Sequence, residues 1–83
     1  MDPELIEHAR RDIDLARRNL PHDPMLAAFI VRSLPATEAA GLKDLAWVMS
    51  KTYCTPDEAT KLLDDLAAYV TAEEVKLYDQ SSE

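Results

Sequence analysis

The stretch T-P-D-E-A-T-K-L-L-D-D-L-A-A-Y-V, residues 55–70, decides the fold because it joins a helix start signal to a helical apolar face. Thr55 is a good N-cap, Pro56 suits the first turn, and Glu58 follows the cap by three residues, as in a capping box. The apolar residues that share one broad face of the helical wheel are Ala59, Leu62, Leu63, Leu66, Tyr69 and Val70. The sequence therefore predicts a helix that begins at Thr55 and packs through this face.

Glu73 determines where this helix is predicted to end. In an uninterrupted helix its carboxylate lies in the middle of the apolar face, where burial of a charge is costly. Thr71 and Glu74 repeat the capping-box spacing of Thr55 and Glu58. We therefore predict a break at Thr71 and a short last helix over residues 72–79, with Val75 and Tyr78 facing inward.

The first half of the chain predicts two further helices. Residues 4–20 carry apolar side chains at helical spacing, namely Ile6, Ala9, Ile13, Ala16 and Leu20. Pro21 and Pro24 then interrupt the helix, since proline lacks an N–H and disfavours a helical predecessor. Residues 25–34 follow as a helix that is apolar all round, which predicts the centre of the fold or half of a dimer interface. A strand over Phe29–Val31 is the alternative, but it has no partner strand in the sequence.

The third helix is predicted to begin at Ala36 or Thr37 and to be firm from Leu42 to Tyr53, although Gly41 also permits a start there. One face of its wheel carries Leu42, Leu45, Ala46, Met49 and Tyr53. Trp47 falls on the opposite side. The chain is thus predicted to be all-α, a small four- or five-helix orthogonal bundle that forms a single domain over residues 1–83, with residues 1–3 and 80–83 frayed.

The charge distribution favours some partners over others. The formal net charge is −7, and residues 35–83 hold ten acids against four lysines, whereas residues 1–34 hold six acids against five arginines. An acidic domain is repelled by nucleic acid and by anionic membranes, so we expect a protein partner with a basic surface. No apolar run reaches the roughly 18 residues of a membrane span, and a single cysteine forms no internal disulfide, so we expect a cytoplasmic protein.

Catalytic and metal chemistry lack the necessary residues. His8, His22 and Cys54 are far apart in the sequence and match no metal-ligand spacing. Adjacent carboxylates such as Asp64 and Asp65 diverge by about 100° on a helix, so they do not converge on a substrate. Since no phosphate-binding loop is present either, we expect no enzyme activity, no cofactor and no metal.

Three groups of residues are the candidate contact surfaces. Trp47, one helical turn from both Lys43 and Lys51, is either an exposed aromatic anchor with a basic rim or is covered by the first helix or the N-terminus. Asp57 and Asp64 mark the acidic outer face of the helix over residues 55–70.

The third group is the arginines of the first helix. Arg10 and Arg17 flank its apolar stripe, while Arg11 and Arg18 are placed to pair with Glu7 and Asp14 at i,i+4. Such a row is either a solvated face or a surface that meets acidic residues, either in the second half of the chain or in a partner.

These features favour a non-enzymatic protein–protein interaction module, an acidic adaptor, inhibitor or regulatory subunit of the kind found among bacterial and phage regulators. Residues 42–66 also resemble the outline of a helix-turn-helix, which implies a DNA-binding regulator as an alternative. The connection over residues 50–55 is longer than the usual turn and the second helix is acidic, so DNA contact then falls to the arginine row. A homodimeric structural domain is a third alternative.

Overall fold

Prolines begin four of the five helices that the structure describes. The structure is a computed structural model that describes residues 1–81. Its helices are α1 (Pro3–Asn19), α2 (Pro24–Val31), α3 (Pro35–Ala39), α4 (Lys43–Lys51) and α5 (Pro56–Ser81). Proline suits the first helical position because its fixed φ is helical and its missing N–H has no partner there. The all-α prediction is confirmed. Of the residues predicted to fray, 1–3 and 80–83, Pro3 belongs to α1 and residues 80 and 81 belong to α5, while residues 82 and 83 lie outside the described part.

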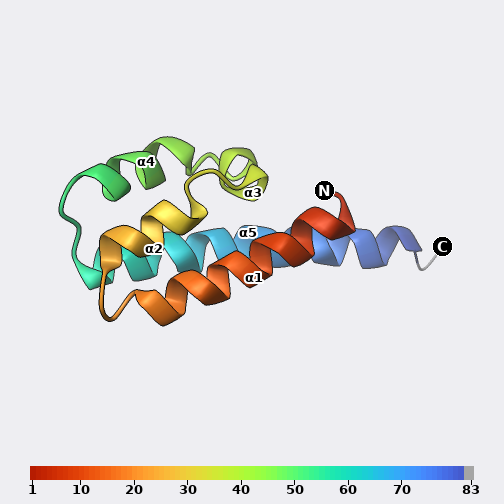
Figure 1. Cartoon of the computed structure of the whole chain (residues 1–83). Coiled ribbons are helices and arrows are strands. Elements are labelled where there is room, and N and C mark those ends of the chain that lie inside the picture. The colour runs from red at the N-terminus through yellow and green to blue at the C-terminus, as the bar shows by residue number, and fades with distance from the viewer. Residues whose placement is uncertain (82–83) are drawn as a thin grey trace.

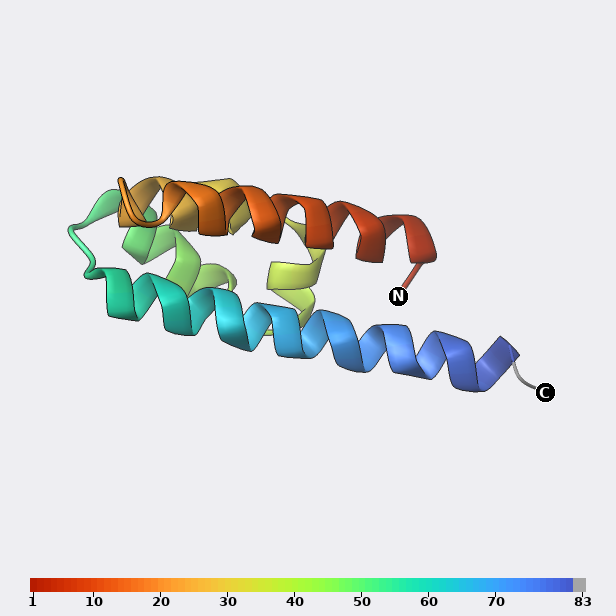
Figure 2. The ribbon, with the colours of Figure 1, turned by 90° about the horizontal axis from the view of Figure 1, so that it is seen from below.

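The two long helices form the frame of the bundle. α1 and α5 run side by side in opposite directions, and α5 continues past the start of α1 (Figures 1 and 2). α2 packs against α1, α4 and α5, in agreement with its predicted central place. Its outer side is nevertheless open, because Leu26 and Phe29 are 39% and 50% exposed.

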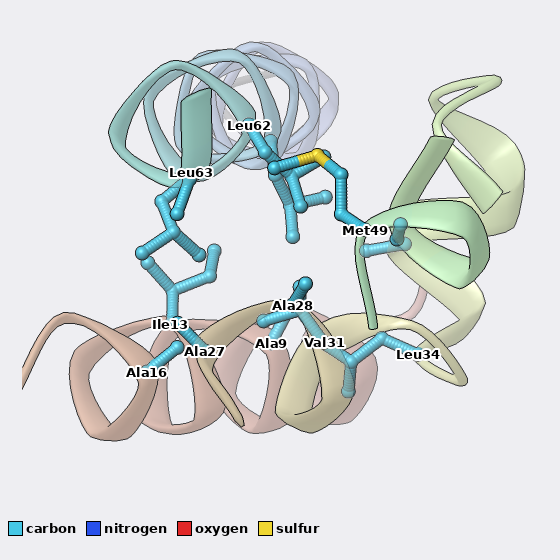
Figure 3. Packing of buried hydrophobic residues seen from close by; sticks show 14 of the residues in the cluster. Ala9, Ile13, Ala16, Ala27, Ala28, Val31, Leu34, Met49, Leu62 and Leu63 are labelled. Carbon is cyan, nitrogen blue, oxygen red and sulfur yellow. The ribbon is translucent and has the colours of Figure 1, made fainter. Parts of the chain in front are cut away.

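The core lies between α1, α2 and α5 and is closed on one side by α4 (Figure 3). Small side chains from α1 and α2 allow these two helices to approach closely, and Ile13 and Leu63 point toward each other across the α1–α5 interface. Met49 extends from α4 toward Leu62 and is buried. The fully enclosed large side chains are Leu62, Leu63, Leu66, Val31, Val70 and Thr37.

The predicted capping box at the start of α5 is present. The Thr55 backbone N–H donates to Glu58 Oε1 at 3.0 Å, and the Glu58 N–H donates to Thr55 Oγ1 at 3.2 Å. Aspartates cap the two N-terminal helices in a similar way. Asp2 accepts from the Glu4 N–H at 3.0 Å, and Asp23, after the predicted interruption, accepts from the Leu26 N–H at 3.1 Å.

The predicted break at Thr71 is wrong, because α5 runs without interruption from Pro56 to Ser81. Glu73 is tolerated in this helix because its carboxylate is compensated. It is hydrogen-bonded to Tyr69 and lies 3.6 Å from both the Met1 amino group and Lys76 Nζ. The inward orientation predicted for Val75 and Tyr78 is wrong as well, since they are 52% and 68% exposed.

The predicted third helix is divided into α3 and α4 at Gly41. This glycine has φ +74°, a left-handed conformation that other residues adopt at a steric cost. The alternative start near Gly41 is therefore the correct one. On α4 the core face is narrower than predicted: Ala46 and Met49 are buried, whereas Leu45 is 49% exposed and Tyr53, beyond the helix end, is 82% exposed.

Candidate functional site

An apolar groove lies between the start of α1 and the end of α5, and we call it the α1–α5 groove. Its volume is about 640 Å³, and its apolar lining consists of Pro3, Ile6, Leu77 and Tyr78. Its charged lining consists of Glu7, Arg10 and Glu74. A smaller cavity of about 290 Å³ follows along the same pair of helices, and Arg10 lines both cavities. The seam between the two long helices is thus hollowed over much of the length of α1.

Two ion pairs tie α1 to α5 along this seam. Arg10 Nη2 lies 2.7 Å from Glu74 Oε1, and Arg10 Nε donates to Glu74 Oε2 at 3.3 Å, so the pair is bidentate. Arg17 Nη2 lies 3.0 Å from Asp64 Oδ1. Three predicted contact residues, Arg10, Arg17 and Asp64, are therefore brought together here. The carboxylates that pair with Arg10 and Arg17 thus come from the second half of the same chain, the first of the two predicted alternatives.

The carboxyl group of Glu73 has a lowered pKa. The main cause is the hydrogen bond from the Tyr69 hydroxyl, with further contributions from the positive charges of Lys76 and of the Met1 amino group. The same hydrogen bond raises the pKa of Tyr69. Tyr69 and Lys76 are four residues before and three residues after Glu73, so this signal was present in the sequence.

Trp47 lies in a second cluster, made of Phe29 and Arg32 from the α2 segment and Trp47 and Lys51 from α4, which we call the Trp47 cluster. The Arg32 guanidinium carbon is 3.9 Å from the Trp47 ring centroid and 4.0 Å from that of Phe29. Lys51 Nζ is 5.3 Å from the Trp47 centroid. The cover of Trp47 therefore includes Arg32 and Lys51, neither of which belongs to the first helix or the N-terminus. Arg32 was missed in the sequence because its place depends on how α2 packs against α4.

Hydrogen bonds fix the position of Arg32 in this cluster. Arg32 Nη1 donates to Ser50 Oγ at 3.2 Å, and Ser50 Oγ donates to the Trp47 carbonyl at 2.8 Å. The Trp47 Nε1 atom is enclosed and has no acceptor among the described residues. Cation–π stacking rather than a hydrogen bond thus holds the indole ring.

The other two predicted contact residues lie apart from these sites. Lys43, at the start of α4, has its Nζ 4.0 Å from Glu38 Oε2. Asp57 is exposed in the first turn of α5. The basic rim of Trp47 is therefore provided by Arg32 and Lys51, while Lys43 is engaged with a carboxylate of α3.

Most cations of the chain have a carboxylate of the same chain as their partner. Seven of the nine lysines and arginines have a carboxylate oxygen within 4.0 Å: Arg10, Arg11, Arg17, Arg18, Lys43, Lys61 and Lys76. Within residues 1–81, Arg32 and Lys51 are the two that have no such partner. Both belong to the Trp47 cluster.

The arginine row of α1 is neutralised along its length. The expected i,i+4 pairs are present, with Arg11 3.7 Å from Glu7 and Arg18 2.6 Å from Asp14. A DNA backbone contacting this row has to displace a carboxylate from each arginine. The arrangement consequently gives no support to the DNA-binding alternative.

Reactive groups do not gather at either site. In the described part of the chain, no group of three or more His, Cys, Asp or Glu residues is placed to hold a metal ion. Cys54 is buried, and this burial, followed by the nearby charges of Glu58 and Asp23, raises the pKa of its thiol. A thiol with a raised pKa is a poor nucleophile, because the thiolate is the reactive form. Across residues 1–81, every helix is too short or too polar to cross a bilayer.

Comparison of the chain with protein-family models, with curated proteins and with solved structures gives no match.

Proposed function

We propose that this chain is a non-enzymatic protein–protein interaction module, an acidic adaptor, inhibitor or regulatory subunit that binds a basic amphipathic helix of another protein in the α1–α5 groove. The observation that carries the proposal is the groove itself, about 640 Å³ in volume and lined by apolar side chains of two helices. An apolar groove between helices is a common receptor for the apolar face of a third helix.

The lining residues follow the spacing that such a contact needs. On α1 they are residues 3, 6, 7 and 10, and on α5 they are residues 74, 77 and 78. Residues three and four apart form one row on a helix surface, so each wall of the groove is a single row. A helix that lies over the groove contacts both rows, at the usual separation of about 8–10 Å between packed helix axes.

Charge decides what kind of helix suits the groove. The charged side chains that line the groove are two acids, Glu7 and Glu74, and one base, Arg10, so its net charge is −1. The carboxylate of Glu74 is paired with Arg10, but these side chains are 35% and 44% exposed, and pairs of this kind contribute only about 0.2–1 kcal/mol. A lysine or arginine of the partner competes for Glu74 at little cost. Apolar residues for the groove and basic residues for its rim therefore define the partner.

We further propose that the module acts in the cytoplasm. Cys54 is its single cysteine and is buried as a free thiol, which fits a reducing compartment.

Binding of a designed helical peptide tests the proposal. The probe has 18 residues, with leucine at i, i+3, i+4 and i+7 spacing and lysine elsewhere, and its affinity is measured by calorimetry at two salt concentrations. We expect saturable binding that weakens as salt rises. Replacing each leucine of the probe by serine, at unchanged charge, should abolish binding, because the apolar contact is then lost.

Two matched variants of the protein locate the contact. Tyr78→Ser removes an aromatic ring from the groove, whereas Tyr53→Ser removes an even more exposed ring at the opposite end of α5. We expect Tyr78→Ser to weaken binding about tenfold, or 1.4 kcal/mol, and Tyr53→Ser to leave it unchanged. Equal affinities of Tyr78→Ser and Tyr53→Ser for the leucine probe would mean that the peptide binds outside the groove. If the serine probe binds as tightly as the leucine probe, binding results from nonspecific charge attraction alone. Light scattering of the free protein excludes a homodimer as the occupant if the chain is monomeric.

A further inference from the structure

The two cations that have no carboxylate partner among the described residues both lie against the same aromatic ring. Arg32 and Lys51 lie 3.9 Å and 5.3 Å from the Trp47 centroid, although they come from different segments of the chain. The chain has sixteen acidic residues and nine lysines and arginines. The other seven lysines and arginines each form an ion pair with an acidic residue of the same chain. The Trp47 cluster is therefore a local concentration of positive charge on an acidic protein.

The guanidinium of Arg32 is fixed in position by two aromatic rings and one hydrogen bond. Its guanidinium stacks on both Phe29 and Trp47, and one N–H group donates to Ser50. A guanidinium has five N–H donors, and the described residues engage Arg32 through this one hydrogen bond. A side chain whose plane is already fixed loses less conformational freedom when it binds a carboxylate.

We propose that Arg32 and Lys51 form a carboxylate-binding site that receives an acidic side chain of a peptide segment from a partner protein. The neighbouring residue of that segment is apolar and packs on Phe29, which is 50% exposed. This site is independent of the α1–α5 groove and prefers the opposite charge. The protein thus offers a partner an apolar acidic groove and, separately, an aromatic basic contact.

The overall charge distinguishes a single carboxylate from a polyanion. With a net charge of −7, the molecule repels nucleic acid and other polyphosphates at long range. A single carboxylate carries one charge and gains charge-assisted hydrogen bonds at short range, where they are roughly twice as strong as neutral ones. An acidic peptide with apolar neighbours therefore matches the chemistry of the cluster better than a phosphate polymer does.

Trp47 is the single tryptophan of the chain, so its fluorescence reports directly on the site. The probe is the acetylated and amidated peptide Leu-Glu-Leu-Glu-Leu, and the control peptide has glutamine in place of both glutamates. We expect the acidic peptide to change the Trp47 emission in a saturable way and the glutamine peptide to leave it unchanged.

Protein variants assign the effect to the cluster. Lys51→Gln should weaken binding about tenfold, while Lys61→Gln, an exposed lysine of α5 paired with Asp65, should not. Arg32→Gln should weaken binding further, and thermal unfolding of each variant shows that it is folded. If Lys51→Gln and Lys61→Gln bind the peptide equally, the proposal is wrong.

Two further measurements test the nature of the ligand. Inorganic phosphate that produces the same emission change at the same concentration would overturn the assignment to a peptide carboxylate. An emission change that appears on raising the concentration of the protein alone would identify a second copy as the source of the carboxylate and would overturn the assignment to another protein. The groove is tested by the lysine-rich helix and Tyr78, so either proposal can fail without the other.

Discussion

The pattern Thr-X-X-Glu occurs twice in the chain, at Thr55–Glu58 and at Thr71–Glu74, and the two copies have different structures. The first begins α5 with both hydrogen bonds of a capping box. The second lies inside α5, which continues through it. The comparison shows that the capping pattern permits a helix start without imposing one.

Proline and tertiary contacts account for the difference. Pro56 disfavours a helical conformation for Thr55, so the chain must start a new helix there. Thr71 is followed by Ala72, which has no such effect. The acidic residues after it are moreover engaged elsewhere, since Glu74 pairs with Arg10 and Glu73 with Tyr69 and Lys76.

Ala72→Pro places a proline after Thr71, as Pro56 follows Thr55, and should therefore interrupt α5 at the second Thr-X-X-Glu copy. Ala72 is exposed, so the change affects the backbone rather than the core. A proline inside a helix costs about 3 kcal/mol, which is about 12–24 °C in melting temperature for a domain of this size. Circular dichroism should show this loss of stability together with a loss of helix.

The control for this variant is Ala72→Gly, which should cost only about 1 kcal/mol. Similar melting temperatures for the two variants would mean that residues 72–81 do not depend on continuity with the rest of α5.

Replacing each threonine by alanine should produce a smaller difference in stability between the two copies. Thr55→Ala removes an N-cap and should lower the free energy of unfolding by about 1 kcal/mol. Thr71→Ala changes an exposed residue inside a helix and should have an effect within about 0.5 kcal/mol. Urea unfolding of both variants measures the difference, and a similar loss in both would show that the second threonine also caps a helix.

Local signals in the sequence were sufficient for most helix starts. Pro56 in the first turn of α5, the capping box at Thr55 and the i,i+4 pairs of α1 depend on neighbours within four residues, and the structure contains all of them. The starts predicted at residues 4, 25 and 36 or 37 lie within two residues of the prolines that begin α1, α2 and α3. The left-handed Gly41 was likewise recognisable as a point where the chain can leave a helix.

Features that depend on the packing of distant helices were not predictable in this way. A helical wheel assigns an inward face to Leu45 and Tyr78, but a residue is buried only where another element covers it. The same holds for the stacking of Arg32 on Trp47 and for the α1–α5 groove, since each requires two separate helices to be placed relative to one another. The incorrect break at Thr71 has a local cause: the helical wheel places Glu73 on the apolar face, but Tyr69, four residues earlier, donates a hydrogen bond that compensates its carboxylate.

Tyr69→Phe gives the smallest expected effect and tests why Glu73 is tolerated inside α5. Both Glu58 and Glu73 have a lowered pKa, but the main cause at Glu58 is the backbone N–H of Thr55, whereas at Glu73 it is the Tyr69 hydroxyl. The variant keeps the aromatic ring and removes the donor. The pKa of Glu73 should therefore rise toward its ordinary value of about 4.3, while that of Glu58 stays lowered. An NMR titration of the glutamate carboxyl carbons measures both.

The sign of the accompanying stability change follows from linkage. A carboxyl group whose pKa is lowered by folding stabilises the folded state above its unfolded pKa, and this contribution is lost as the pH falls through the folded pKa. Stability of the wild-type protein should thus decrease on acidification below about pH 5, and Tyr69→Phe should decrease less steeply. An unchanged slope, with an unchanged pKa of Glu73, would assign the compensation to Lys76 and the Met1 amino group. The second Thr-X-X-Glu copy would then remain helical through charge pairing instead of through the tyrosine.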